Sequence, residues 1–268
     1  MVMLLVLISC GQSHRSQKPQ VVVSIEPLRY FVEQIVGDKY QVTSLVPAGS
    51  SPETYEPTPA QMMAMSDSRV FLAFGTLQTE KVWTERISES VPQIAVALVA
   101  DSIDYLREPD GSFDPHVWTS PRNARLIAAN VCHAISALDT TNADYYKSNL
   151  TRLISRIERT DSMVHALLDG SMCRTFVIYH PALTYFAHEY GFIQIPIEKE
   201  GKEPTPELLK SIIVRAKSEK VRSVLVQKEF NESNASIIAG EIGAKVQTIN
   251  PLSYDWDGQI IDIARKLK

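Results

Sequence analysis

The sequence predicts an α/β protein with two lobes, each a small parallel sheet flanked by helices, joined by a long rigid helix. The prediction rests on two stretches in which short β-rich runs alternate with helical patterns, and on a continuous helical region between them. Such alternation is typical of parallel sheets covered by helices. We expect residues 1–19 to be a signal and tether, 20–120 and 171–268 to be the two lobes, and 121–170 to be the connecting helical region.

The first residues form a short apolar run, Met1 to Ser9, which ends at Cys10 and a polar stretch. The run is far too short to span a bilayer, and its abrupt change to polar residues favours a secretory signal over a buried strand. The tetrapeptide Leu7-Ile8-Ser9-Cys10 resembles a bacterial lipobox, in which the cysteine is acylated after cleavage. The extreme amino terminus carries no Lys or Arg, which departs from the usual signal. We expect an exported periplasmic or cell-surface lipoprotein, anchored to the membrane at Cys10.

Strands and helices alternate in each lobe. The predicted strands of the first lobe are Val21 to Ile25, Tyr40 to Val46, Val70 to Phe74 and Ile94 to Val99. Those of the second are Thr175 to Tyr179, Phe192 to Ile197, Val221 to Val226 and Lys245 to Ile249. A helix is expected at Glu26 to Val36, and another opens near Thr58-Pro59.

The connecting region contains two helical patterns, Pro121 to about Leu138 and about Asn142 to Leu168. Apolar residues recur at near-helical spacing in the second pattern, which predicts one amphipathic helix roughly 40 Å long at 1.5 Å per residue. A helix of that length fits a rigid connector between lobes. Two helices packed within a single domain would give the same pattern.

Composition narrows the function classes. The net charge is −4 and no block of Lys or Arg is present, so we expect no nucleic-acid partner. Cys132 and Cys173 lie in apolar periodic surroundings, where cysteine is usually a small buried hydrophobe. We expect no essential disulfide, although spacing alone leaves their pairing open.

Three residues with metal-ligand chemistry occupy loops that follow predicted strands. Glu53 follows the Tyr40 to Val46 strand, His116 precedes the long helical region, and His180 follows the Thr175 to Tyr179 strand. Ligands of parallel α/β sheets bind beyond the carboxyl ends of the strands, and imidazole and carboxylate suit borderline divalent ions. From the residues alone, a metal site and ordinary surface or hydrogen-bonded histidines are equally compatible with the pattern.

Five segments occur in the order typical of one family. They are PAGSSPETYEPTP, DPHVWTSPRNA, YHPALTYFAHEYG, EKEGKEPTPELL and INPL. Together they resemble the metal-binding receptors of zinc and manganese ABC importers, over nearly the whole chain after the signal. The resemblance implies two α/β lobes joined by a long helix, one metal ion between them, and a membrane permease as partner. We expect the receptor to be a monomer.

The resemblance also implies ligands. It places metal-binding histidines at His116 and His180, and a histidine at the latter position is similar to the zinc branch. Two positions depart from the family pattern: Glu53 stands where histidine is common, and Asn250 where many members have Asp. We expect Zn²⁺ as the transported ligand, while the harder Glu53 oxygen also admits Mn²⁺ or Fe²⁺. Asn250 is a weak fourth candidate, because its side chain offers only a neutral amide oxygen.

Other acidic residues near these segments have several interpretations. Asp114 is expected to orient His116. Glu198, Glu200 and Glu203 read as a solvated loop. Alternative oxygen donors to Asn250 are Glu229, Asp255 and Asp257.

Two other function classes fit parts of the sequence. A zinc hydrolase can also use two histidines and a carboxylate, but the chain contains no HExxH, GxSxG or Gly-rich phosphate loop. We therefore predict that the chain is not an enzyme. An adhesin is the third class, because a tethered receptor can acquire surface partners without changing its fold.

Overall fold

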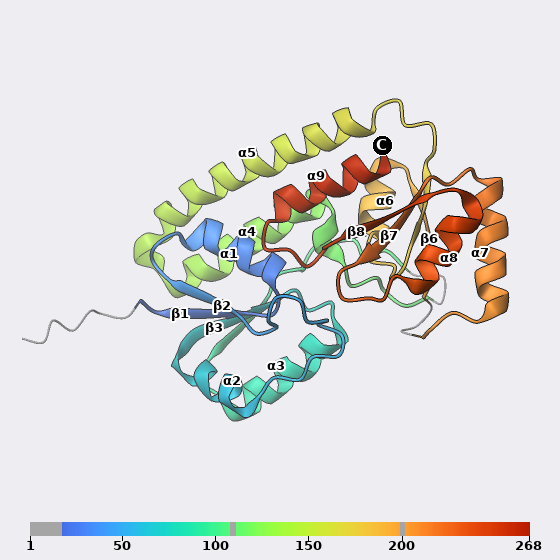
Figure 1. Ribbon diagram of the computed structural model, residues 1–268. Coiled ribbons are helices and arrows are strands. Elements are labelled where there is room, and N and C mark those ends of the chain that lie inside the picture. The colour runs from blue at the N-terminus through green and yellow to red at the C-terminus, as the bar shows by residue number, and fades with distance from the viewer. Residues whose placement is uncertain (1–17, 108–110, 199–201) are drawn as a thin grey trace, which may run out of the picture.

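The computed structural model describes residues 18–107, 111–198 and 202–268, so the predicted anchor at Cys10 lies outside the described residues. Figure 1 shows two sheets with helices around them. The amino-terminal sheet contains β1 (Gln20–Val23), β2 (Gln41–Ser44), β3 (Ser68–Ala73) and β4 (Ala95–Leu98). The carboxyl-terminal sheet contains β5 (Thr175–Ile178), β6 (Ile193–Pro196), β7 (Ser223–Gln227) and β8 (Lys245–Ile249). The two-lobed α/β prediction is confirmed.

Helices connect and cover the strands. They are α1 (Glu26–Val36), α2 (Pro59–Ala64), α3 (Gln78–Ser90), α4 (Pro121–Leu138), α5 (Ala143–Leu168), α6 (Thr184–Tyr190), α7 (Pro206–Ser218), α8 (Ser233–Ile242) and α9 (Trp256–Leu267). Helix α4 begins as its sequence indicates: Pro121 stands in the first turn, and the Ser120 hydroxyl accepts from the backbone N–H of Asn123 at 3.1 Å. Both features favour helix initiation.

The two sheets share one topology. The strand orders are β2-β1-β3-β4 and β6-β5-β7-β8, and every neighbouring pair is parallel. In each sheet the order reverses at one place, between β1 and β3 in the first and between β5 and β7 in the second. Loops at the carboxyl ends of strands that flank such a reversal form a crevice where ligands bind.

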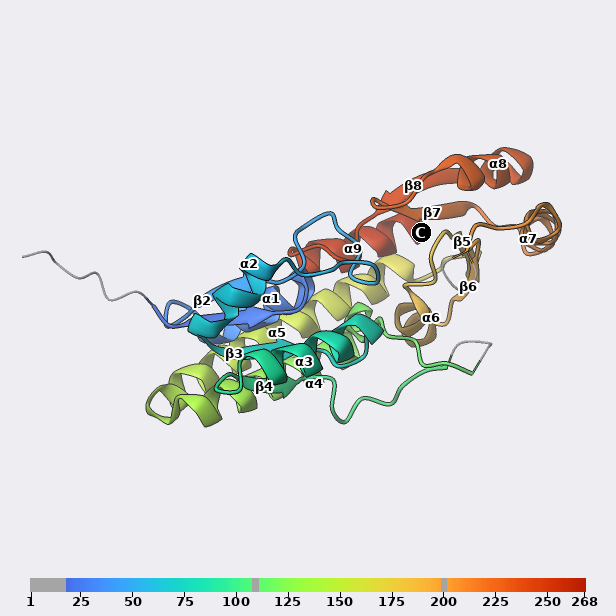
Figure 2. The ribbon, with the colours of Figure 1, turned by 90° about the horizontal axis from the view of Figure 1, so that it is seen from below.

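Helix α5 is the long connector. Its 26 residues correspond to about 39 Å, and it runs past both sheets in Figures 1 and 2. It packs against α1 and α4 on the amino-terminal side and against α9 on the carboxyl-terminal side. One hydrophobic cluster runs from the first sheet through these helices to Phe176 and Ile178 of β5. The two halves are therefore joined by a shared core rather than by a flexible linker.

Two further findings concern membrane-spanning helices and the cysteine thiols. None of the helices in the described part of the chain is both long and apolar enough to cross a membrane. Cys132, in α4, and Cys173, just before β5, are both free thiols. The boundaries drawn at residues 20, 121 and 171 stay a prediction.

Candidate metal centre

Glu53, His116 and His180 converge where the two halves meet. The Nε2 atoms of His116 and His180 lie 3.2 Å apart, and His180 Nε2 lies 3.2 Å from Glu53 Oε1. One ligand atom from each residue falls within 4.8 Å of the other two. Among the described residues, this is the one group of three or more His, Cys, Asp or Glu side chains close enough to hold a metal ion.

The spacing fits a small divalent ion. Two ligands about 2.1 Å from a tetrahedral ion stand about 3.4 Å from each other, close to the two separations of 3.2 Å. The cavity that the three residues line has a volume of about 20 Å³, and a single water-sized sphere needs about 10–15 Å³. The arrangement can therefore enclose one ion, with a coordination position left for a fourth donor.

A buried carboxylate fixes His116. Asp114 is fully buried, and its Oδ1 accepts from the backbone N–H of His116 at 2.7 Å and contacts Nδ1 at 2.9 Å. The Thr76 hydroxyl donates to the carbonyl of Pro115 at 2.7 Å and so ties this loop to the end of β3. Burial opposes ionisation of Asp114, but the charge and hydrogen bonds of His116 hold its pKa below the usual range. With Nδ1 engaged, Nε2 faces the site.

A second buried carboxylate fixes His180. Glu198 is only 6% exposed, and its Oε1 lies 3.2 Å from His180 Nδ1. The expectation of a solvated loop is therefore wrong for Glu198; Glu203 is exposed, and Glu200 lies outside the described residues. The signal that sequence reasoning missed is position, because Glu198 directly follows the buried Ile197 at the end of a strand.

The two carboxylates around His180 control its charge. Burial alone would lower the pKa of His180, but hydrogen bonds and charges from Glu198 and Glu53 outweigh it and raise this pKa to about 10. The same hydrogen bond from His180 lowers the pKa of Glu53, against the opposing effect of burial. Both shifts in pKa favour an imidazolium beside a carboxylate.

Glu53 forms the outer side of the centre. Its side chain is 39% exposed, compared with 13% for His180. The loop that carries it follows β2 and is tied to α3, because the Thr79 hydroxyl donates to the carbonyl of Pro52 at 2.8 Å. Solvent therefore reaches the centre past Glu53.

The alternative oxygen donors occupy different places. Glu229 lines the same cavity, and burial raises the pKa of its carboxyl group. Asn250 is not among the residues that line it, although Pro251 and Leu252 are. Asp255 caps α9 by accepting from the backbone of Gly258 at 3.2 Å. Asp257 accepts from the hydroxyl groups of Tyr30 and Thr160 at 2.7 and 3.2 Å, away from the histidines.

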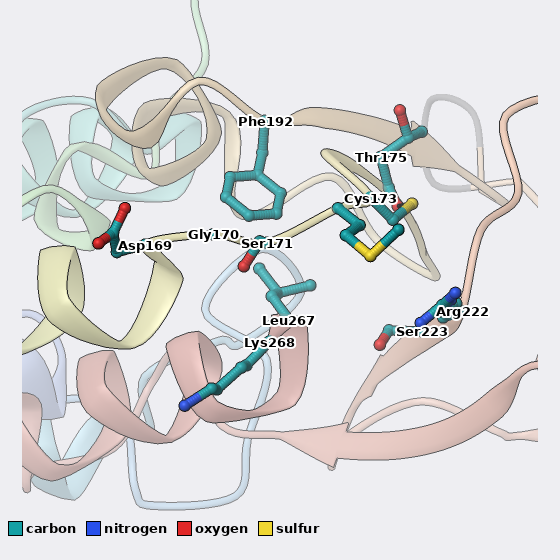
Figure 3. Close-up of a pocket in the computed structure, with 11 residues that line it drawn as sticks. Asp169, Gly170, Ser171, Cys173, Thr175, Phe192, Arg222, Ser223, Leu267 and Lys268 are labelled. Atoms are coloured by element: carbon teal, nitrogen blue, oxygen red, sulfur yellow. Dashed lines mark hydrogen bonds between the residues drawn. The ribbon is translucent and has the colours of Figure 1, made fainter.

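A larger cavity, of about 230 Å³, lies at the opposite edge of the carboxyl-terminal sheet. Thr175 and Ser223, which begin β5 and β7, line it together with Asp169, Cys173 and Arg222. Figure 3 shows Asp169 and Arg222 at opposite ends of this cavity, so its charged groups do not converge. Ligand chemistry, rather than size, selects the smaller cavity as the candidate site.

The molecule has two lobes, each with a parallel sheet, and helix α5 forms a helical spine along both. Side chains with metal-ligand chemistry come from both halves and meet at their junction. This arrangement is that of a two-lobed substrate-binding protein. A family model described as the zinc-uptake complex component A, periplasmic, matches residues 21–263. The chain belongs to this family of substrate-binding proteins of zinc and manganese ABC importers. Its members are binding proteins rather than enzymes, are extracytoplasmic, and serve a membrane permease.

Individual relatives cover nearly the whole chain. A crystal structure of ZnuA superposes with a TM-score of 0.90 at 33% identity, over 94% of this chain and 98% of that one. The high-affinity zinc uptake system protein ZnuA of Bacillus subtilis is 28% identical, over 92% of this chain and 85% of its own length. The manganese-binding lipoprotein MntA of Halalkalibacterium halodurans is 27% identical, over 92% of this chain and 85% of its own length. The chain thus resembles both zinc-binding and manganese-binding relatives.

Proposed function

We propose that this chain is a lipid-anchored extracytoplasmic receptor that binds one Zn²⁺ ion between its lobes and delivers it to an ABC import permease. Glu53 and His116 from the amino-terminal lobe and His180 from the carboxyl-terminal lobe bind the ion. The observation that carries the proposal is the 3.2 Å separation of two imidazole nitrogens from opposite halves, each ring held by its own buried carboxylate. Such carboxylate–histidine pairs are typical of metal centres.

The preference for zinc rests on donor chemistry. Two imidazoles suit Zn²⁺, whereas the Glu53 oxygen makes the donor set harder than three histidines and lets Mn²⁺ or Fe²⁺ compete. Membrane attachment would come from acylation of Cys10. A single metal centre built wholly within one chain fits a receptor that acts as a monomer.

Metal binding by site variants tests the proposal. The purified soluble form should bind about one Zn²⁺ per chain, and His116→Ala and His180→Ala should each weaken binding by at least about a hundredfold. Wild type should gain about 2.7 kcal/mol of stability at a hundredfold excess of zinc over Kd, and both variants should lose most of that gain. Chelator competition and thermal melts with and without zinc measure these effects.

The matched control is His188→Ala, because His188 is an exposed histidine on α6. Its zinc affinity and thermal shift should equal those of wild type. A folded wild-type protein that binds no transition metal would overturn the proposed function, and unchanged affinity in both site variants would overturn the ligand assignment.

A further inference from the structure

The last residue of β7 and the turn that follows it contact His180 from two sides. The Gln227 side chain donates to the carbonyl of His180 at 2.6 Å and accepts from its backbone N–H at 3.3 Å. Three residues later, the ring of Phe230 stacks on the His180 ring, with centroids 5.5 Å apart and planes 19° from parallel. The turn is closed by the Phe230 backbone N–H, which donates to the Gln227 carbonyl at 3.1 Å. This segment and the candidate ligand are thus held in one fixed relation.

Glu229 lies between these two anchoring residues and lines the cavity that contains Glu53, His116 and His180. Strands β5 and β7, which lead to His180 and Glu229, flank the place where the strand order of their sheet reverses. Burial raises the pKa of Glu229, whereas its own backbone N–H and the charges of His180 and His116 act in the opposite direction, so its carboxylate already senses the groups of the candidate centre. A half-buried carboxylate in such a position is stabilised when a cation enters the cavity.

The other oxygen donors fit this position less well. Asn250 does not line the cavity, and its backbone N–H donates to the Gln259 side chain at 3.0 Å. Asp255 and Asp257 are engaged in the cap of α9 and in contacts between helices.

We propose that Glu229 supplies the fourth ligand of the metal centre. The inference rests on the proposed function and names a residue that neither the ligand geometry of the metal-free centre nor the family resemblance assigns. Glu229 lines the cavity but stands outside the tight group of three, so the proposal requires its carboxylate to turn toward the ion about the side-chain bonds. Two carboxylates and two imidazoles form a harder donor set than the family pattern of histidines, so Glu229 supports Mn²⁺ binding more strongly than Zn²⁺ binding.

The test compares Glu229→Gln with two controls, Glu232→Gln and Asn250→Ala. Glu232 is an exposed glutamate three residues along the chain that contacts Thr248, so its substitution removes the same charge without touching the cavity. Affinities for Zn²⁺ and Mn²⁺ come from chelator competition, and the Co²⁺-loaded protein reports ligand number through its visible absorption. We expect Glu229→Gln to weaken Zn²⁺ binding at least tenfold and Mn²⁺ binding more, and to change the Co²⁺ spectrum. Both controls should stay within threefold of wild type with unchanged spectra.

The outcomes separate this inference from the proposed function. If wild type binds one ion while Glu229→Gln keeps its affinities and Co²⁺ spectrum, the fourth-ligand assignment is wrong and the receptor function stands. If Glu229→Gln and Glu232→Gln weaken metal binding equally and leave the Co²⁺ spectrum unchanged, Glu229 acts only through its charge at a distance. That result would also overturn the assignment. A strong effect of Asn250→Ala alone would assign the position to Asn250. Absence of binding by wild type would overturn the function itself.

Discussion

A proton on His180 Nε2 and a metal ion compete for the same lone pair. At a pKa of about 10, the imidazole is protonated at neutral pH, and its Nε2 lies 3.2 Å from both Glu53 Oε1 and His116 Nε2. An arriving ion needs the same lone pair. Binding of the ion therefore releases a proton. Before the ion binds, a protonated His180 can donate a hydrogen bond within the centre, which reduces the repulsion that unprotonated ligand atoms at this distance would otherwise have.

We expect zinc binding to release about one proton per ion from pH 7 to 8.5, and affinity to rise about tenfold per pH unit over that range. Calorimetric titrations in buffers of different ionisation enthalpy measure the proton count. Glu198→Gln removes one of the two carboxylates that raise the His180 pKa, so it should release a smaller fraction of a proton at pH 8. Release that has already vanished at pH 8 in wild type would contradict the bound proton.

The same pKa shift has the opposite effect on the metal-free fold. Because the folded-state pKa of His180 lies above the ordinary value of 6.5, its contribution to stability is complete below about pH 6.5 and is lost as pH rises toward about 10. Melting temperatures without metal should therefore fall across this window while the increment from zinc grows. The opposite pH trends of the two melting temperatures are therefore a second, independent measure of the proton on His180.

At the scale of single residues, the sequence predicted the three candidate side chains and the support of His116 by Asp114, but not the support of His180 by Glu198. The loop positions of His116 and His180 left a metal site and ordinary histidines equally compatible with the sequence, and the family resemblance selected both residues as candidate ligands. Glu198 was interpreted as solvated because a run of charged residues around it is the usual mark of an exposed loop. Its burial depends on a contact with His180, 18 residues earlier in the chain, and no local pattern encodes such a contact.

Among the elements, the helices were predicted most accurately where local signals mark their ends. The predicted bounds of α1 and α4 coincide with the observed ones, and α5 begins one residue later than expected. Strand ends differ more, because a strand begins and ends where its neighbours do: β1 was expected to reach Ile25 but pairs only from Gln20 to Val23. Pairing is set by the sheet and not by the β-rich run alone.

Asp257 at the start of α9 ties three helices together. It accepts from Tyr30 of α1 and Thr160 of α5 and contacts the guanidinium group of Arg156. We expect Asp257→Asn to lower the free energy of unfolding by about 1.5–3 kcal/mol, the contribution typical of hydrogen bonds to a charged group. Zinc affinity should be unchanged, because the network lies outside the cavity of the metal centre.

Chemical denaturation and chelator competition measure these two quantities. The matched control is Asp262→Asn on the same helix, since Asp262 makes a partly exposed contact with Lys266 and such pairs contribute little. A loss of zinc affinity in Asp257→Asn equal to its loss of stability would contradict the separation of helix packing from the metal centre.

Across the whole molecule, the two halves share one core. The same hydrophobic cluster contains Phe31 of α1, Ile157 of α5, Phe176 of β5 and Ile263 of α9. A second cluster covers only the outer part of the carboxyl-terminal sheet. Because close-packed cores do not deform continuously, a wide hinge between the lobes would have to break the shared one. Metal capture should then proceed by local movement of loops and side chains.

Spin labels on both lobes test this rigidity. Met63 in α2 and Val214 in α7 are 74% and 62% exposed, so cysteines at these positions, with Cys132 and Cys173 replaced, carry labels without disturbing the core. The distance between the labels should change by less than about 2 Å when zinc binds, since a ligand shifts lobes only by its differential affinity for the two arrangements. A pair within one lobe, Val214 and Ile237, gives the reference for label motion. A shift of about 5 Å or more across the lobes, with none in the reference pair, would show that the helical spine bends and that the shared core is not continuous in solution.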